Sequence, residues 1–579
     1  MKKESKKKLG FKQWCLEFLK RNYIYIIMVV LVALRIGLGY AMGAWYGADQ
    51  TCDDLVMFDG LSLKRLTQPD YMSLVKDLNF SVFLGVSAIS KLPYTIVLSL
   101  FWVLAALTTW LLVRKVCKNK WVQLVIFSYV LFLPTAFEAW GGLRVYRNSI
   151  IVPCIILTFS LALMVLVNLI KKEKMSRTAW IAVATGFSFA FLYYLQEDGI
   201  WIMACMLVIF AISFAIICYR LFRKKKKERI LAKNAIAWLA ICLVPFVVLF
   251  SWGTVYKSVN QKFFGVYETN TRTKGELAKY IEKTYIVDSP NRSKTVWSPY
   301  DAIEATFKVS PTLQEHSKIL EKIKITPWSA GDAEKNPFPR EYLGWVIRVA
   351  IADAGYWTSE KDVSDMFKQV NIELDEAFSK GDLKKAEGRV QLLKSAGAYT
   401  WGEIFDGQFV DHLFRSFRDA IWLEGYTIGF YSQVGDTDYK RDNTILHMSG
   451  DINNSKGVKR EIGNVVANII VWIYRVVNIA LMALSLWFII YQAVKLIKNW
   501  KIKKKYVKDN RLELVLAVTS FMFLGVTIVY SLGISWFFTE EFTRQIFVFY
   551  HIGMSGILVF VYMPALIGTN HFLARRAKK

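Results

Sequence analysis

Long apolar segments without charge recur along the chain, and they constrain its fold more than any other feature of the sequence. A helix needs about 20 apolar residues to cross the hydrocarbon core of a bilayer, which is roughly 30 Å thick. The sequence therefore predicts an α-helical polytopic membrane protein with about ten transmembrane helices. The expected spans are 22–40, 92–113, 121–138, 148–170, 178–195, 199–219, 234–254, 465–494, 512–531 and 546–568.

The composition agrees with this fold class and divides the chain into three parts. Apolar residues make up 54% of the 579 residues, with 20 Trp, 28 Tyr and 39 Phe, which is too apolar and aromatic for an average soluble domain. We expect an N-terminal membrane module at 1–254 with about seven helices and a C-terminal one at 465–579 with about three. The polar insert between them, 255–464, is long enough to be a domain and is expected to be mainly helical.

The net charge of +27 lies in short segments between the spans. Because Lys and Arg in short loops stay on the cytoplasmic side, this pattern predicts a cell-membrane protein with both termini in the cytoplasm. The loop 41–91 and the insert 255–464 would then be extracytoplasmic. Basic residues scattered over separate loops do not form the single basic face of a nucleic-acid-binding protein, so we expect no nucleic acid partner. The basic segments are 1–21, 114–120, 171–177, 220–233, 495–511 and 569–579.

The first apolar segment is expected to stay as a helix, because it is longer than the apolar core of a signal peptide and further spans follow. None of the seven cysteines falls in the insert, so neither a disulfide framework nor a cysteine metal site is predicted. Within the insert, Ser310 followed by Pro311 is a typical helix start. An apolar stripe from Val363 to Phe378 predicts a second helix, which would be capped by Ser359 and end at Gly381.

Two pairs of adjacent acids fall in predicted outer loops. Asp53 and Asp54 follow the first span, and Glu197 and Asp198 occupy the tight turn between the fifth and sixth spans. Carboxylates at membrane depth are costly unless they are paired or hydrated. These four residues are therefore candidates for a functional site.

Three arginines are the candidate partners of those acids. Arg144 and Arg147 lie in a short connection on the predicted outer side, where Arg is disfavoured by the usual charge bias. The planar guanidinium can donate two parallel hydrogen bonds to a phosphate. Arg35 lies within the first span. It is either a functional residue or extends its guanidinium to the outer membrane–water interface.

Group transfer from a lipid phosphate requires at least an acid that accepts a proton from the acceptor hydroxyl and, close to it, arginines that bind the phosphate leaving group. The chain has no Walker motif, dinucleotide-binding turn or HExxH motif, so nucleotide-driven chemistry has no support in the sequence.

The motifs resemble those of known membrane enzymes. Asp53-Asp54, Tyr146-Arg147 and the turn 196–201 are similar to motifs of a largely uncharacterised family of Gram-positive membrane proteins. More broadly, the chain resembles the GT-C superfamily of glycosyltransferases, which use polyprenyl-phosphate sugars and carry acids in the first outer loop. The resemblance covers most of residues 20–400. It continues in the segments Phe264-Gly265-Val266-Tyr267-Glu268-Thr269-Asn270, Gly275-Glu276 and Ala354-Gly355-Tyr356-Trp357.

The resemblance implies an inverting sugar transfer to a cell-envelope glycan or glycolipid on the outer face of the membrane. It implies that Asp53 or Asp54 is the base, and that Arg147 binds the donor phosphate, with Arg144 and Arg35 as the next choices.

The resemblance further implies that Gln196, Glu197 and Asp198 orient the substrate. The family has Arg where this chain has Gln196, and Cys52 stands where an aromatic residue is usual. The change at position 196 implies a different donor, a different acceptor or lost activity. Some members of the superfamily use a divalent metal. The acids here could bind one through oxygen, but we assign no metal ligand.

Two other functions agree less well with the sequence. A transporter or a lipid or polysaccharide flippase would show internal repeats or broken helices and charges near the membrane midplane. The sequence has no visible repeat, and its spans are nearly free of charge. A scaffolding protein would use the insert for binding, but it would leave the acids and arginines without a role.

Overall fold

The computed structural model describes residues 11–45, 67–195, 199–222, 231–391, 394, 396–429, 444–448, 457–499, 507, 510–537 and 551–577. Over this part of the chain the secondary structure is helical, with isolated β-bridges and no strand. Eight helices are long and apolar enough to cross a membrane. The expectation of an α-helical, multi-pass membrane protein is thus confirmed. The eight spans are Arg21–Met42, Tyr94–Val116, Asn148–Lys171, Ile200–Leu221, Ala232–Phe264, Val458–Lys498, Arg511–Ser535 and Gly553–Arg576.

Two of the expected spans correspond to helices that are not among these eight. The expected span 121–138 contains α6 (Lys120–Leu131), which stops short because Pro134 begins a separate 3₁₀ turn, η2 (Pro134–Ala136). The expected span 178–195 matches α8 (Met175–Tyr193). The total of ten transmembrane helices therefore stays a prediction.

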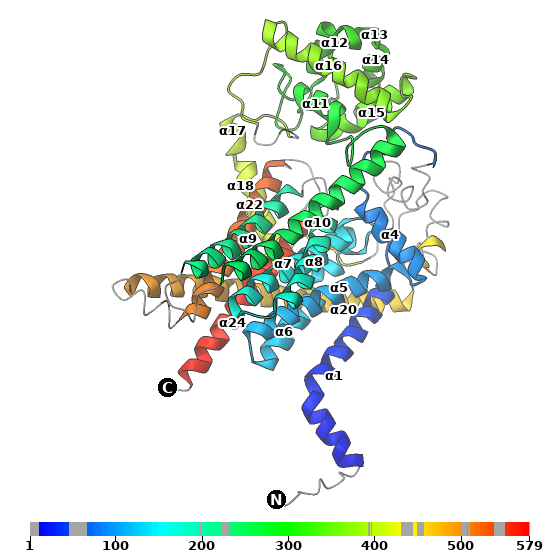
Figure 1. Cartoon of the computed structure of the whole chain (residues 1–579). Coiled ribbons are helices and arrows are strands. Elements are labelled where there is room, and N and C mark those ends of the chain that lie inside the picture. Colours follow the sequence, from blue (N-terminus) through cyan, green and yellow to red (C-terminus); the bar gives the residue numbers. More distant parts are fainter. Residues whose placement is uncertain are drawn as a thin grey trace, which may run out of the picture.

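The membrane helices form a bundle, and the insert lies beyond one end of it (Figure 1). Both chain termini lie toward the opposite end (Figure 1). The bundle contains α1 (Phe11–Met42), α5 (Tyr94–Val116), α6, α7 (Asn148–Lys171), α8, α9 (Ile200–Leu221), α10 (Ala232–Phe264), α20 (Val458–Lys498), α22 (Arg511–Phe537) and α24 (Gly553–Arg576).

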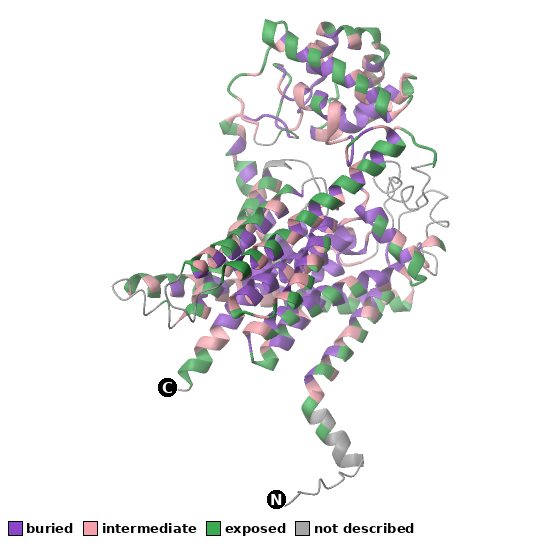
Figure 2. Ribbon diagram, in the orientation of Figure 1, coloured by how far each residue is buried: buried purple, intermediate pink, exposed green. Residues whose placement is uncertain are grey.

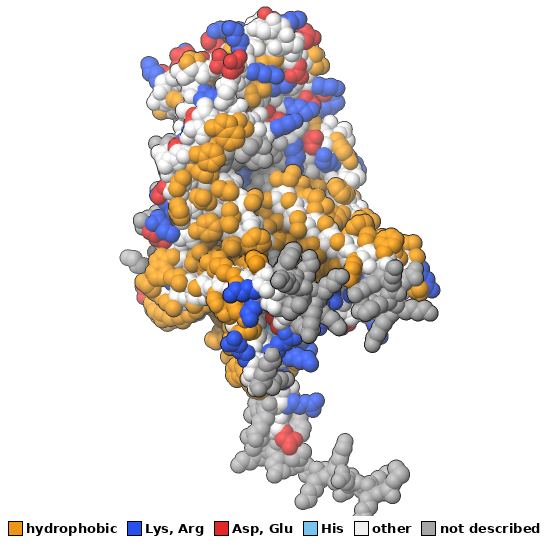
Figure 3. Space-filling view, turned by 90° about the vertical axis from the view of Figure 1, so that its left-hand side faces the viewer, with side chains coloured by type: hydrophobic (Ala, Val, Ile, Leu, Met, Phe, Trp, Pro, Cys, Tyr) orange, Lys and Arg blue, Asp and Glu red, His pale blue; other side chains and the backbone are white. Residues whose placement is uncertain are grey.

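Helix α10 joins the bundle to the insert. At 1.5 Å per residue its 33 residues extend about 50 Å, which exceeds the roughly 30 Å of a bilayer core. The excess length carries the chain out of the bundle to Gly265, which ends the helix at φ +74°. The apolar face that would meet lipid is visible as a broad band in Figure 3, while charged side chains gather on the insert and at the opposite edge.

The buried apolar residues form two large cores and a small third cluster of Leu74, Phe264 and Val266, and Figure 2 shows the largest core inside the bundle. The second large core extends from Leu277 to Ile404. Three residues that follow it, Ala420, Leu423 and Leu446, pack into the bundle core instead. The expected insert 255–464 thus contributes its last part to the membrane module.

The insert is helical, and both helix starts expected within it are confirmed. Ser310 accepts the N–H of Leu313, and Ser359 accepts that of Asp362. Gly381 ends the second helix at φ +82°. The helices are α11 (Gly275–Thr284), α12 (Tyr300–Val309), α13 (Pro311–Glu315), α14 (Lys318–Lys324), η4 (Pro327–Ser329), η5 (Arg340–Tyr342), α15 (Leu343–Asp353), α16 (Glu360–Lys380) and α17 (Trp401–Ile404).

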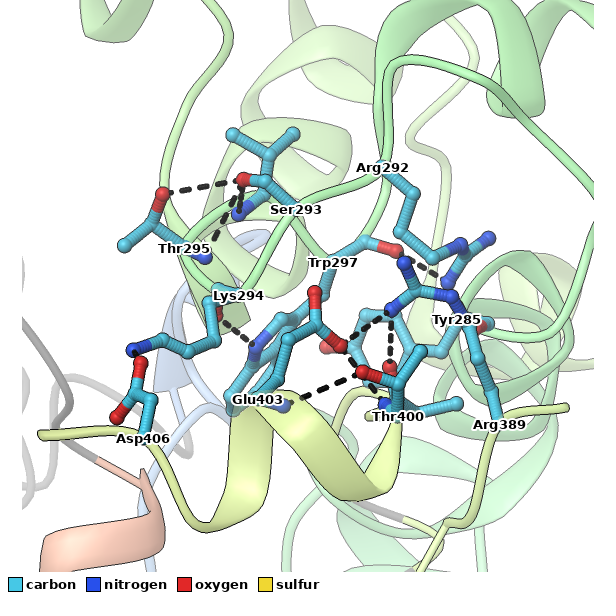
Figure 4. A network of polar contacts seen from close by, with 12 residues as sticks. Tyr285, Arg292, Ser293, Lys294, Thr295, Trp297, Arg389, Thr400, Glu403 and Asp406 are labelled. Atoms are coloured by element: carbon cyan, nitrogen blue, oxygen red, sulfur yellow. Dashed lines mark hydrogen bonds and ion pairs between the residues drawn. The ribbon is translucent and has the colours of Figure 1, made fainter. Parts of the chain in front are cut away.

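A network of polar contacts lies where the chain leaves the insert (Figure 4). Arg389 donates to Glu403 at 3.1 Å, and Glu403 also completes the capping box of α17. Lys294 pairs with Asp406, whose carboxylate caps the next helix, α18 (Gly407–Trp422). The network therefore fixes the start of α18.

Helix α18 returns the chain to the bundle. The amide of Asn478 in α20 donates to the carbonyl of Ile421 at 3.1 Å, and the guanidinium of Arg475 donates to that of Trp422 at 3.0 Å. The residues that follow α18 consequently lie against the end of the bundle.

The arginine of a buried ion pair in the insert also binds the loop 41–91. Arg348 of α15 pairs with Glu360 of α16 at 2.5 Å, and their side chains are 0% and 3% exposed. The same guanidinium donates to the carbonyl of Tyr71 and to the hydroxyl of Thr271, at 2.7 and 2.8 Å. One side chain thus connects three segments that lie far apart in the sequence.

Candidate functional site

The acids predicted to do chemistry lie in two segments outside the described residues. Asp53 and Asp54 belong to 46–66, and Gln196, Glu197 and Asp198 to 196–198. The structure describes the chain on both sides of each segment. These flanking residues show which elements the candidate loops begin and end on.

The loop that carries Asp53 and Asp54 begins beside the predicted arginines. Trp45, the last described residue before it, donates its backbone N–H to Leu143 at 3.0 Å and accepts the N–H of Val145 at 2.8 Å. This parallel bridge sets Trp45 opposite Arg144. The indole of Trp45 also donates to the carbonyl of Ala139 at 2.6 Å, and the residue is fully buried. Main-chain bonds therefore hold the start of the loop against the segment 139–145.

Arg144 and Arg147 are held by aromatic rings. The guanidinium of Arg144 lies 4.7 Å from the ring centre of Tyr146 and 5.9 Å from those of Trp45 and Trp140. Arg147 lies 5.3 Å from Tyr146. Stacking uses the face of the guanidinium and hydrogen bonding uses its edge, so a stacked Arg keeps its geometry for binding a phosphate.

A π-helical turn, η3 (Ala139–Leu143), shapes this arginine segment. A side chain at Gly141 would meet Ile552 at 1.8 Å, and one at Gly142 would meet the carbonyl of Thr135 at 2.2 Å. At Gly142 the close atoms are backbone and exclude any side chain, whereas a side chain at Gly141 would require Ile552 to shift. The Trp-Gly-Gly sequence of this turn is thus explained by close packing.

Glu138 is a buried acid beside the arginine segment that the sequence analysis did not assign. It is fully buried, and its Oε2 accepts the N–H of Gly141 at 2.5 Å. Its backbone pairs with Ile428, and the next amide, of Ala139, donates to Thr427 at 2.9 Å. Glu138 therefore joins η3 to the chain that returns after α18. An acid directly before Trp-Gly-Gly was the signal that could have identified it.

Burial raises the pKa of Glu138 to about 7, although the N–H of Gly141 opposes this shift. The carboxylate of Asp419 adds to it by repulsion. The folded protein then keeps a proton that an unfolded Glu, with a pKa of about 4.3, loses as the pH rises from about 4 to 7. The contribution of Glu138 to stability is complete below pH about 4 and is lost as the pH rises to about 7.

Substitution of Glu138 by Gln is expected to remove this pH dependence, which amounts to on the order of 3 kcal/mol. Gln retains an oxygen for the N–H of Gly141 but cannot ionise. The measurement is the thermal unfolding midpoint in detergent between pH 4 and 8, for the wild type and Glu138→Gln. Glu304→Gln, at an exposed site in the insert, is the control. Equal pH slopes in the wild type and Glu138→Gln would contradict this assignment.

Arg35 is enclosed within the bundle. Its side chain is 1% exposed, donates to Ser99 at 3.1 Å, and lies 4.8 Å from the ring centre of Phe137 and 5.9 Å from that of Trp102. Gly39, one turn later, leaves room for it, since a side chain there would meet the guanidinium at 2.8 Å. A phosphate could reach Arg35 only if these rings moved. Its role as a phosphate ligand stays a prediction.

The later part of the loop 41–91 is fixed to the end of α8, the helix that precedes residues 196–198. The amide of Asn79 donates to the carbonyls of Ala190 and Phe191 in α8, at 3.2 and 2.7 Å. The backbone N–H of Leu78 donates to the hydroxyl of Tyr256 at 2.7 Å. The described residues before and after 46–66 are therefore held against the segment 139–145 on one side and against α8 and α10 on the other.

Asp77 lies in the same region and is buried. The amide of Asn270 donates to it at 3.2 Å, and the ammonium of Lys274 lies 4.0 Å away. Lys274 also lies 5.7 Å from the ring centre of Tyr194, just before the turn 196–198. The motif-bearing segment 264–276 thus contacts Asp77 of the loop 41–91.

The described residues contain no group of three or more His, Cys, Asp or Glu side chains that could hold a metal ion. The candidate acids are outside that search, so metal dependence stays open to experiment. No family model, curated protein or solved structure matches this chain.

Proposed function

We propose that this protein is an inverting membrane glycosyltransferase that transfers a sugar from a polyprenyl phosphate to a cell-envelope glycan or glycolipid. The observation that carries the proposal is the bridge between Trp45 and Arg144. It starts the loop of Asp53 and Asp54 directly beside two arginines stacked on aromatic rings. A loop that carries carboxylates and starts beside such arginines supports the proposal, because this reaction needs a proton acceptor and a phosphate-binding group.

In the proposed reaction, the carboxylate of Asp53 or Asp54 takes the proton of the acceptor hydroxyl. The hydroxyl oxygen attacks the anomeric carbon, and a new glycosidic C–O bond forms with inversion. The bond between that carbon and the phosphate oxygen breaks, and its electron pair stays on the polyprenyl phosphate. Arg147, supported by Arg144, would stabilise the added negative charge through parallel hydrogen bonds.

The reaction is proposed to take place on the outer face of the membrane. The two chain ends lie on the opposite side of the bundle from the insert (Figure 1), and basic segments lie at both ends of the sequence. Because Lys-rich and Arg-rich segments favour the cytoplasm, this arrangement supports an extracytoplasmic insert and cytoplasmic termini.

The direct test uses the purified protein in lipid vesicles that contain a panel of polyprenyl-phosphate sugars and cell-envelope glycan acceptors. We expect one donor to lose its sugar to an acceptor, with inverted anomeric configuration of the product. Movement of the donor across the bilayer without transfer of sugar would instead favour a flippase, and no transfer from any donor would contradict the proposal.

Arg147→Lys is expected to raise the KM for the donor about tenfold, because Lys keeps the charge but loses one of two hydrogen bonds to the phosphate. Steady-state kinetics with varied donor concentration measures this change. Arg114→Lys is the matched control, since Arg114 also lies over an aromatic ring, 4.5 Å from the centre of Trp110, but at the far end of α5. An unchanged KM in Arg147→Lys would argue against a planar phosphate contact.

A further inference from the structure

A cleft of about 750 Å³ opens on the insert between α11 and α16. Its volume lies within the usual range of small-molecule binding sites, about 300–1,000 Å³. None of the residues assigned to sugar transfer lines it. The cleft is therefore a separate site whose ligand has to be inferred from its lining.

The charges that line the cleft nearly cancel. Five lysines and four carboxylates surround it. Glu276 pairs with Lys279 at 2.7 Å, and Asp375 pairs with Lys283 at 2.8 Å. A strongly anionic or cationic ligand would find little net charge of the opposite sign.

Several polar groups of the lining are joined to one another. Asn371 of α16 donates to the carboxylate of Glu276 at 3.0 Å and to its carbonyl at 2.9 Å. The ammonium of Lys283 donates to the carbonyl of Asn371 at 2.6 Å. Donors and acceptors thus lie close together where α11 contacts α16, which suits a ligand whose groups can both donate and accept.

Hydroxyl groups have this property, since each offers one donor and two acceptor positions. A neutral polyhydroxylated ligand can insert into the network without leaving a buried charge unpaired. Glu282, which lines the cleft and is half-buried, offers a carboxylate whose pKa is raised by burial against the effect of Lys394 and Lys279. Ala278, Ile286 and Ile372 supply apolar surface for the C–H faces of a sugar ring.

One end of the cleft adjoins the candidate site. Lys274 lines the cleft, and its ammonium also lies 4.0 Å from Asp77 of the first outer loop. Glu268 lines the same end and pairs with Lys257 of α10 at 3.1 Å. A chain-like ligand held in the cleft would have one end directed toward the membrane module.

We propose that the cleft between α11 and α16 binds a short, uncharged saccharide chain. That this saccharide is the acceptor rests on the proposed function, whereas its binding does not. The cleft would then hold the chain of the acceptor while its terminal hydroxyl reaches the first outer loop.

The test is binding to the full-length protein in lipid nanodiscs, measured by isothermal titration calorimetry. The probes are three short neutral oligosaccharides, built of glucose, galactose or N-acetylglucosamine, and inorganic tripolyphosphate. We expect at least one oligosaccharide to bind and tripolyphosphate not to bind. Ile372→Trp, which fills the cleft from an exposed position of α16, should weaken binding at least tenfold.

Further variants make the result specific. Glu376→Trp places the same side chain on α16 outside the cleft, where it removes only a surface ion pair with Lys380, and it should bind as the wild type does. Glu282→Met removes one acceptor and should weaken binding severalfold. Whichever of Asp53→Asn and Asp54→Asn loses transfer should still bind the oligosaccharide, so that loss of transfer and loss of binding are distinguished.

Three outcomes would overturn the proposal. They are no binding of any of the three oligosaccharides to the folded protein, binding of tripolyphosphate in preference to them, and equal binding by Ile372→Trp and the wild type.

Discussion

Exchange of Asp53 or Asp54 for Asn is expected to lower the rate of sugar transfer by about 10²- to 10⁴-fold, the usual contribution of a general base. Asn is nearly isosteric but cannot accept the proton of the acceptor hydroxyl. Only one of the two variants should show the full loss, because one carboxylate takes the proton. The measurement is single-turnover transfer in vesicles, with each variant at the same protein density in the membrane.

The control for these variants is Asp70→Asn in the same loop. Asp70 is exposed, and its Oδ1 accepts the N–H of Met72 at 2.9 Å, which the amide oxygen of Asn can also do. Transfer by Asp70→Asn should stay close to that of the wild type. Full activity of both Asp53→Asn and Asp54→Asn would contradict a carboxylate base in this loop.

The helices could be predicted because their signals are local. An apolar run of about 20 residues specifies a transmembrane helix regardless of its neighbours. The same holds for the cap at Ser359 and the end at Gly381, where one residue type satisfies the backbone geometry. Span 121–138 was predicted too long because its hydropathy continues past Leu131, whereas Pro134 ends the helix sterically.

The assembly of the candidate site could not be predicted, because its contacts join distant parts of the chain. The sequence marks Arg144 as unusual but does not indicate that Trp45 pairs with it. The need for Gly141 arises from Ile552, more than 400 residues later. Such contacts leave no periodic pattern in the sequence. The acids and arginines could be named from the sequence, but not the backbone bonds that bring their segments together.

Glu138 illustrates the same limit for a single residue. An acid at the end of an apolar segment has the features of a helix end at the membrane surface. In the structure it is fully buried, because the chain after α18 returns to the bundle and covers it. This return of the chain depends on Asn478 and Arg475 of α20, whose side chains donate hydrogen bonds to carbonyls at the end of α18. Burial, and with it the raised pKa, is therefore a property of the tertiary fold.

Arg348→Met is expected to destabilise the insert by about 3–5 kcal/mol, the usual cost of leaving one partner of a buried ion pair alone. The carboxylate of Glu360 would stay buried without its cation, and the carbonyl of Tyr71 and the hydroxyl of Thr271 would lose their donor. Limited proteolysis of the purified protein as a function of urea concentration measures the loss. Cleavage sites should appear first between Leu277 and Ile404, the limits of the insert core.

The double variant Arg348→Met/Glu360→Gln separates the charge from the packing. If the unpaired carboxylate causes the loss, removing it as well should restore a large part of the stability, since neutral replacements of a buried pair are much less costly than breaking it. Lys361 directly follows Glu360 and forms an exposed pair with Asp365. Lys361→Met should change stability by less than about 1 kcal/mol. Equal loss in Arg348→Met and the double variant would show that the hydrogen bonds of Arg348 to Tyr71 and Thr271, rather than its ion pair with Glu360, account for its contribution to stability.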